Sequence, residues 1–336
     1  MTLPRDAGSW ARPLLAVAAS VFTITACAGP ADDSAVLADL QTPNRAEVVV
    51  TTSIWADVVR NLSCNALATV TLLIPPGGDP HAYEPSLAAR AVLDSADLVV
   101  ANGLGLEETL DDVLETVEAE STPVFRIGEH VDTLRNSPSE DHDNSPSGDH
   151  DNDDQDDARE RVDPHVWFDP VRVSAALPAL ASALVAEAGL DPARVDTCLT
   201  AYQDQLEAAQ ADITETLSVI PQARRQLVTN HDAFGYFADR YGFEIIGSVI
   251  PSPSTLATTS AGQLEALAEL IESEDVPAIF AEALYSTDDA DALAGRVGNI
   301  EVITLYTGSL GDDSDHAGTY LELLKTNARL IAGALS

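Results

Sequence analysis

Short β-rich segments alternate with helical segments twice along this chain, and a strand-free helical stretch separates the two series. Such alternation predicts parallel sheets that helices cover on both faces. The strands are expected at 48–53, 68–74, 97–101 and 123–127, and then at 226–229, 244–249, 277–281 and 301–304. We therefore expect an α/β chain with two lobes, each built on a four-stranded parallel sheet flanked by helices.

Helices are predicted between these strands and in the zone that separates the two series. They are expected from residue 54 and at 85–95, 106–117, 171–187, 193–219, 233–241, 261–273, 288–297 and 319–335. In 193–219 apolar residues recur every three or four positions, as on one face of an amphipathic helix. At 1.5 Å per residue this helix would span about 40 Å. The predicted organisation is thus a lobe at 46–190, a linking helix at 191–219 and a lobe at 220–336.

An acidic repeat interrupts the first predicted lobe. Residues 137–144 read SPSEDHDN, residues 145–152 read SPSGDHDN, and a run of aspartates follows. The segment 136–161 has too few apolar residues to bury, so a disordered loop is expected there. Its carboxylates and imidazoles could collect divalent cations weakly, and the alternative is a solvated insertion without function.

The N-terminus has the pattern of an export signal. Arg5 and Arg12 precede an uncharged run at 14–25, which is too short to remain as a membrane-spanning helix. Residues 24–27 read Ile-Thr-Ala-Cys, which resembles the bacterial lipobox. We predict a signal peptide at 1–26, a lipid anchor on Cys27, a tether at 27–45 and a position on the outer face of the bacterial cell membrane. The alternative is an ordinary cleaved signal followed by a chance cysteine.

Charge and the remaining cysteines add two expectations. The formal net charge of −38 argues against a nucleic-acid partner, and it suits either a cation ligand or simple solubility. Cys64 and Cys198 remain once Cys27 is assigned to the anchor, and in an oxidising compartment they could form a disulfide. Their separation in the sequence does not show whether they meet.

Three of the seven histidines have similar surroundings. His81 and His165 each follow Asp-Pro, and His231 closes a predicted strand. Ligands of α/β sheets bind at the carboxyl ends of the strands, so these histidines are candidate metal ligands. Neighbouring carboxylates could accept the second imidazole N–H and fix the tautomer that binds metal. The candidates for that role are Asp79, Asp163, Asp232 and Glu282.

The donor atoms indicate which metal to expect. Sites rich in nitrogen suit zinc, copper, nickel or cobalt, whereas manganese, magnesium and calcium prefer oxygen. A copper site would be expected to use Met or Cys, and the one Met is the initiator. We therefore predict Zn²⁺. Three histidines and an open position also describe a catalytic zinc, so an extracellular zinc-dependent hydrolase is the alternative, although no motif supplies its acid or base.

Several longer motifs resemble one known family. They are GDPHAYEP at 78–85, DPHVWFDP at 163–170, HDAFGYF at 231–237 and IFAE at 279–282, and the acidic loop before the second motif is also similar. Over nearly the whole mature chain the sequence resembles the substrate-binding lipoproteins of zinc and manganese ABC importers. The resemblance implies a non-enzymatic, monomeric protein whose partners are a permease and an ATPase.

The resemblance also implies where the metal is bound. It predicts two lobes joined by one long helix, with the metal held in the cleft by His81, His165 and His231. A histidine at the third position resembles the zinc-binding members, since a carboxylate there resembles the manganese-binding ones. The fourth ligand is often a carboxylate after the last strand, where this chain has Gly308. Water, a loop residue, Asp312 or Asp313 could take that place.

Overall fold

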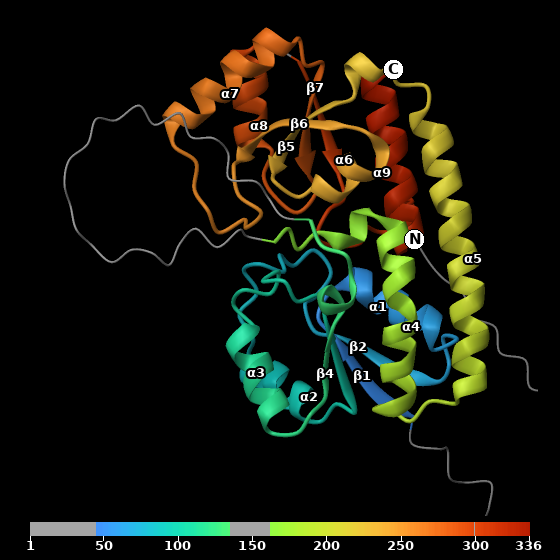
Figure 1. The fold of residues 1–336 in the computed structure, drawn as a ribbon. Helices are drawn as coiled ribbons and strands as arrows, with labels where there is room; N and C mark the ends of the chain where they lie inside the picture. Colours follow the sequence, from blue (N-terminus) through green and yellow to red (C-terminus); the bar gives the residue numbers. More distant parts are fainter. Residues whose placement is uncertain (1–44, 135–161, 299) are drawn as a thin grey trace, which may run out of the picture. The chain divides into compact units, whose positions relative to one another are not determined.

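The structure is a computed structural model that describes residues 45–134, 162–298 and 300–336 (Figure 1). Residues Arg45–Ser336 form one compact unit. The signal peptide at 1–26, Cys27, nearly all of the tether and the acidic loop at 136–161 lie outside the described residues. These expectations, and the predicted boundaries of the lobes, stay predictions.

The eight predicted strands are present and form two parallel sheets. In the first sheet the order is β2-β1-β3-β4, and in the second it is β6-β5-β7-β8. The strands are β1 (Ala46–Val50), β2 (Ala68–Leu72), β3 (Leu98–Ala101), β4 (Val124–Arg126), β5 (Gln226–His231), β6 (Glu244–Ile250), β7 (Ala278–Glu282) and β8 (Glu301–Leu305). The two sheets therefore repeat one topology, and the predicted fold class is confirmed.

Helices flank both sheets close to the predicted positions. They are α1 (Ser53–Leu62), α2 (Leu87–Asp94), α3 (Asp111–Ala119), α4 (Pro170–Ala186), α5 (Pro192–Leu217), α6 (Gly235–Tyr241), α7 (Ala261–Glu274), α8 (Asp288–Arg296) and α9 (Tyr320–Leu335). The two long central helices begin alike, because Asp169 and Asp191 each cap the first turn and a proline follows. The helix expected at 106–117 begins only at Asp111, after a turn that includes left-handed residues.

Alternation along the strands divides the apolar residues between separate cores. In β1, Val48 and Val50 face a large central core, whereas Val49 faces a smaller one under α2 and α3. In β5, Leu227 faces the central core and Val228 faces a core under α7 and α8. The central core thus includes residues from both sheets, and helix α5 packs against α1, α4 and α9.

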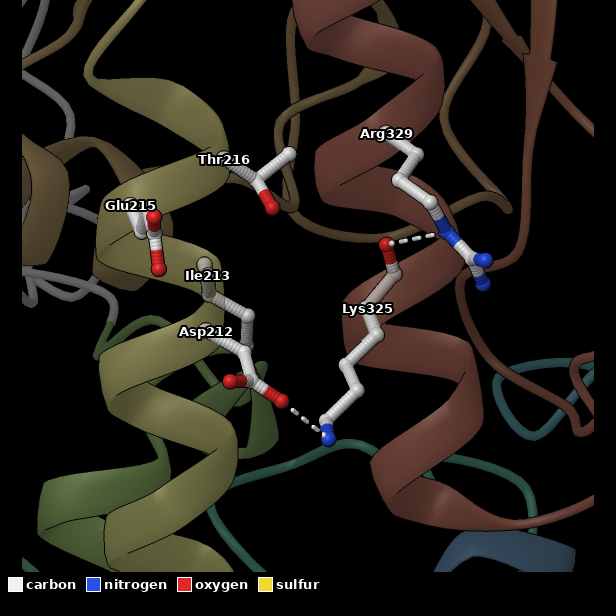
Figure 2. A pocket seen from close by; sticks show the side chains of 6 residues that line it. All are labelled: Asp212, Ile213, Glu215, Thr216, Lys325 and Arg329. Atoms are coloured by element: carbon white, nitrogen blue, oxygen red, sulfur yellow. Dashed lines mark hydrogen bonds and ion pairs between the residues drawn. The ribbon is translucent and has the colours of Figure 1, made fainter.

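Two links outside the core also connect elements that are distant in the sequence. Asp212 of α5 forms an ion pair with Lys325 of α9 at 2.6 Å, and both line a surface pocket between these helices (Figure 2). Cys64, in the turn after α1, is disulfide-bonded to Cys198 of α5, with Cα atoms 5.6 Å apart. None of the helices in the described residues combines the length and apolar content needed to cross a membrane.

Candidate metal centre

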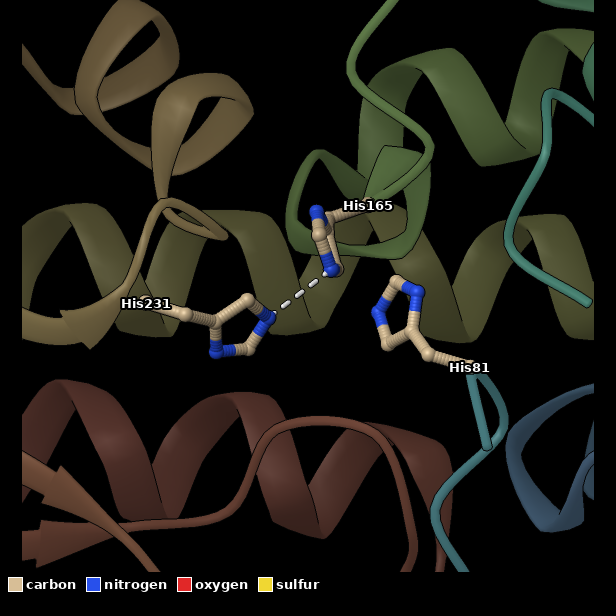
Figure 3. A group of neighbouring side chains, drawn as sticks. All are labelled: His81, His165 and His231. Atoms are coloured by element: carbon tan, nitrogen blue, oxygen red, sulfur yellow. Dashed lines mark hydrogen bonds between the residues drawn. The ribbon is translucent and has the colours of Figure 1, made fainter. Parts of the chain in front are cut away.

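The three histidines singled out from the sequence meet at one point (Figure 3). One ring nitrogen from each of His81, His165 and His231 lies within 4.8 Å of the others, and all three side chains are buried. The Nε2 atoms of His165 and His231 are 3.1 Å apart. Among the His, Cys, Asp and Glu side chains of the described residues, these three histidines are arranged so that they could share one metal ion.

The register of the second sheet positions His231. Thr229 of β5 pairs with Phe280 of β7, so two residues further along the strands His231 lies beside Glu282. The Glu282 carboxylate accepts hydrogen bonds from the main-chain N–H of His231, at 3.2 Å, and from its ring Nδ1. Its other oxygen accepts a hydrogen bond from the hydroxyl of Thr307. The ring therefore turns Nε2 toward the other histidines.

His165 lies in an irregular segment that distant side chains hold in place. Asn102 donates a hydrogen bond to the carbonyl of Pro164 at 3.0 Å, and Tyr236 donates one to the carbonyl of Asp163 at 2.9 Å. The Asp163 carboxylate lies 2.8 Å from Nδ1 of the His165 ring. As with His231, a buried carboxylate binds Nδ1, which leaves Nε2 available to bind a metal ion.

The loop that carries His81 is held by residues of the second half of the chain. Thr255 donates a hydrogen bond to Asp79 at 2.7 Å, and the hydroxyl of Ser309 accepts one from the N–H of Gly77 at 3.1 Å. The other oxygen of Asp79 accepts from the main-chain N–H of His81 at 2.9 Å. Asp79 thus binds the backbone of His81 and leaves its ring to other partners.

The sequence identified the orienting carboxylates only in part. Of the four candidates, Asp163 and Glu282 contact histidine rings. Sequence reasoning missed Thr307, which binds Glu282, and Glu108, which lies 3.8 Å from Nδ1 of His81. Neither residue belongs to a motif that marks it, because its role depends on contacts between loops that are distant in the sequence.

Burial and neighbouring charge separate the pKa values of the three rings. Burial, and then the charge of the neighbouring imidazoles, lowers the pKa of His81 to about 3. The same causes hold the pKa of His165 well below its usual range. Burial also disfavours the charged form of His231, but the Glu282 carboxylate outweighs this effect and raises the pKa of His231. Of the three rings, that of His231 is therefore the one that takes up a proton most readily.

Comparison with known proteins identifies the family. The family model described as "Zinc-uptake complex component A periplasmic" matches residues 48–334. The chain belongs to this family. The zinc-binding protein TroA of Treponema pallidum is 31% identical over 296 residues, which cover 86% of this chain and 88% of that protein. The predicted relation to the substrate-binding proteins of metal ABC importers is confirmed.

Other members of the family are named for the binding of different metals. The manganese-binding lipoprotein MntA of Bacillus subtilis is 28% identical and covers 96% of this chain and 98% of its own length. The iron-binding protein YfeA of Yersinia pestis is 26% identical, with coverage of 94% and 95%. The solved structure of the periplasmic zinc-binding protein TroA from Treponema pallidum superimposes with a TM-score of 0.75 at 30% identity, over 87% of this chain and 99% of that one.

After β8, at the position where the resemblance predicts a carboxylate ligand, this chain has Gly308. A Cβ on Gly308 would lie 3.2 Å from Cδ of Pro80 and 3.3 Å from a methyl of Leu284, so a larger residue would press on the His81 loop. Asp312 is exposed and is not part of the histidine group, and the side chain of Asp313 lies outside the described residues. Which group completes the coordination stays a prediction.

A cavity of about 260 Å³ reaches the site. Its walls include His81, Glu108 and Pro164 from the first half of the chain and Pro253 and Ser254 from the second. Of the three histidines, His81 lines this cavity.

Proposed function

We propose that this chain captures zinc outside the cell membrane and delivers it to the permease and ATPase of an ABC importer. The observation that carries the proposal is the convergence of three buried imidazoles, two of which have Nδ1 fixed by a buried carboxylate. Zinc accepts such nitrogen ligands in a tetrahedral set, and the zinc is here the transported substrate.

The choice of zinc rests on the donor atoms, because relatives are named for zinc, manganese and iron. Manganese favours oxygen ligands, whereas the group of candidate ligands in the described residues is made of imidazoles. Water is the fourth ligand that we favour, since Gly308 has no side chain and Asp312 is exposed and outside the histidine group. The relatives are binding proteins, and Asp163 and Glu282 are engaged with histidine rings, so binding is favoured over the alternative of zinc-dependent hydrolysis.

Metal analysis tests the proposal directly. Protein purified without added metal should contain about one zinc per chain, as expected for one tetrahedral site. In competition with a chelator, zinc should bind more tightly than manganese. The affinity for copper should be measured in the same way, because copper also prefers nitrogen ligands. Preferential retention of manganese would contradict the assignment of zinc.

The pKa values predict that, among the three rings, zinc binding depends on pH through His231. Nε2 of His231 lies 3.1 Å from Nε2 of His165, and a proton between these atoms would have to leave when zinc binds. Affinity should therefore fall as the pH falls through the raised pKa of His231, by about tenfold per pH unit. His81, whose pKa is about 3, should contribute no second proton near neutral pH. Calorimetry in buffers of different ionisation enthalpy measures the protons released, and zinc binding without any proton release at a pH below the pKa of His231 would contradict the prediction.

Lipid attachment is predicted to occur at Cys27. Two acyl chains give stable membrane association, whereas one chain is marginal. Cys27→Ala should therefore move the exported protein from the membrane fraction to the soluble fraction, with zinc affinity unchanged. Fractionation of cells that lack the partner permease measures this, and a variant that stays in the membrane fraction would argue against the anchor.

A further inference from the structure

We infer that Glu108 is the positioning residue for His81: when metal is bound, its carboxylate accepts a hydrogen bond from Nδ1 of that ring. The inference rests on the proposed metal-binding function and adds a residue to it. It would give each of the three histidines an orienting carboxylate, with Glu108 for His81, Asp163 for His165 and Glu282 for His231.

The ring of His81 has an unsatisfied polar atom. Its Nδ1 is buried and has no hydrogen-bond partner among the described residues. In Figure 3 the nitrogen next to the ring carbon that bears the side-chain stem, which is Nδ1, points away from the other two rings, and Nε2 points toward them. An imidazole that binds metal through Nε2 carries its proton on Nδ1. Leaving that N–H unpaired in a buried place would be unfavourable.

Glu108 is placed to remove this cost. Its Oε1 lies 3.8 Å from Nδ1 of His81, and both residues line the same cavity. A movement of about 1 Å would bring the two atoms to hydrogen-bond distance. The nearby carboxylate of Asp79 is already engaged, with one oxygen on the His81 main-chain N–H and the other on Thr255.

The loop before α3 holds Glu108 at this position. Gly103, Leu104 and Gly105 all have left-handed φ angles, between 59° and 75°, so the chain turns sharply after β3. Glu107 then anchors the turn from inside: it is fully buried and accepts hydrogen bonds from Thr51 and from the N–H groups of Asn102 and Gly103. The next side chain, Glu108, faces the cavity.

Metal binding to His81 would strengthen the attraction between its ring and the Glu108 carboxylate. A cation on Nε2 withdraws electron density from the ring, which makes the N–H on Nδ1 a stronger donor. A charged acceptor strengthens the hydrogen bond further. A ring that carries no cation on Nε2 attracts the Glu108 carboxylate less strongly.

Zinc titration of three variants tests the inference. Glu108→Ala should weaken zinc binding about tenfold or more, as losses of orienting partners do in other metal sites. Glu108→Gln keeps an oxygen acceptor and should lose less. Asp112→Ala is the control, because it removes an equal charge from an exposed residue of the same region that does not line the cavity. Its affinity should stay within about twofold, since salt screens exposed charges.

A spectroscopic readout separates positioning from a general effect on the fold. In zinc-loaded protein, long-range ¹⁵N–¹H spectra should show the His81 proton on Nδ1 at a hydrogen-bonded shift in the unmodified chain and in Glu108→Gln, but not in Glu108→Ala. The thermal unfolding midpoint without metal should match in all variants. Equal affinity in Glu108→Ala and Asp112→Ala, or an unchanged Nδ1 proton, would overturn the inference. Failure of the unmodified protein to bind zinc would instead overturn the proposed function.

Discussion

Replacing His231 with alanine is expected to weaken zinc binding by well over tenfold, which corresponds to more than about 1.4 kcal/mol. The change removes a ligand from a site that offers three. It also leaves the Glu282 carboxylate, which is 1% exposed, without its ring partner. A buried charge that loses its partner is unfavourable, so the variant should also be less stable than the unmodified protein when both are free of metal.

Alanine at His81 or His165 should also weaken binding by at least about tenfold. His130→Ala is the matched control, because His130 is exposed and stacks on Phe125 rather than facing the site. Competition with a chromophoric chelator measures all four variants. Near-normal affinity in any of the three would remove that histidine from the ligand set, and a loss in His130→Ala would show that the assay reports unfolding instead.

The fold followed from the sequence because its signals are local. Runs such as Val48–Val50 and Ala278–Phe280 are apolar on successive positions, as expected for strands buried on both faces, and helical periodicity lies between them. Helix α3 begins at Asp111 and not at 106, because the chain forms turns over 104–110, the first of which includes Leu104 with a left-handed φ of 59° that no sequence rule assigns to leucine. Backbone geometry of this kind depends on tertiary contacts.

In the candidate site, too, local sequence signals identify some residues, whereas others depend on tertiary contacts. The repeated Asp-Pro-His motif and the strand-end position singled out His81, His165 and His231, and the structure brings them together. The partners of the rings depend on register and on loop packing. Glu282 reaches His231 because β5 and β7 are neighbours, although the residues are 51 positions apart. The resemblance places the loop of Thr307 near the metal but does not mark Thr307 as a partner of Glu282, and nothing in the sequence brings Glu108 to His81.

Loss of the Cys64–Cys198 disulfide is expected to lower the free energy of unfolding by about 2–5 kcal/mol. The bond closes a segment with a sequence separation of 134, so its removal allows the unfolded chain many more conformations. It also ties the turn after α1 to the long helix α5, and neither cysteine lies among the residues that line the metal cavity. Zinc affinity should therefore change little while stability falls.

Urea unfolding of the double variant Cys64→Ser, Cys198→Ser measures this effect, with the metal removed from both proteins so that bound zinc does not mask it. Both cysteines are partly exposed, so a reductant should lower the midpoint of the unmodified protein toward that of the variant. The variant itself should not respond, which separates the disulfide from other effects of the reductant. Equal midpoints for variant and unmodified protein would mean that the bond contributes no stability. A large loss of zinc affinity in the folded variant would mean that α5 holds the histidines in place through this bond.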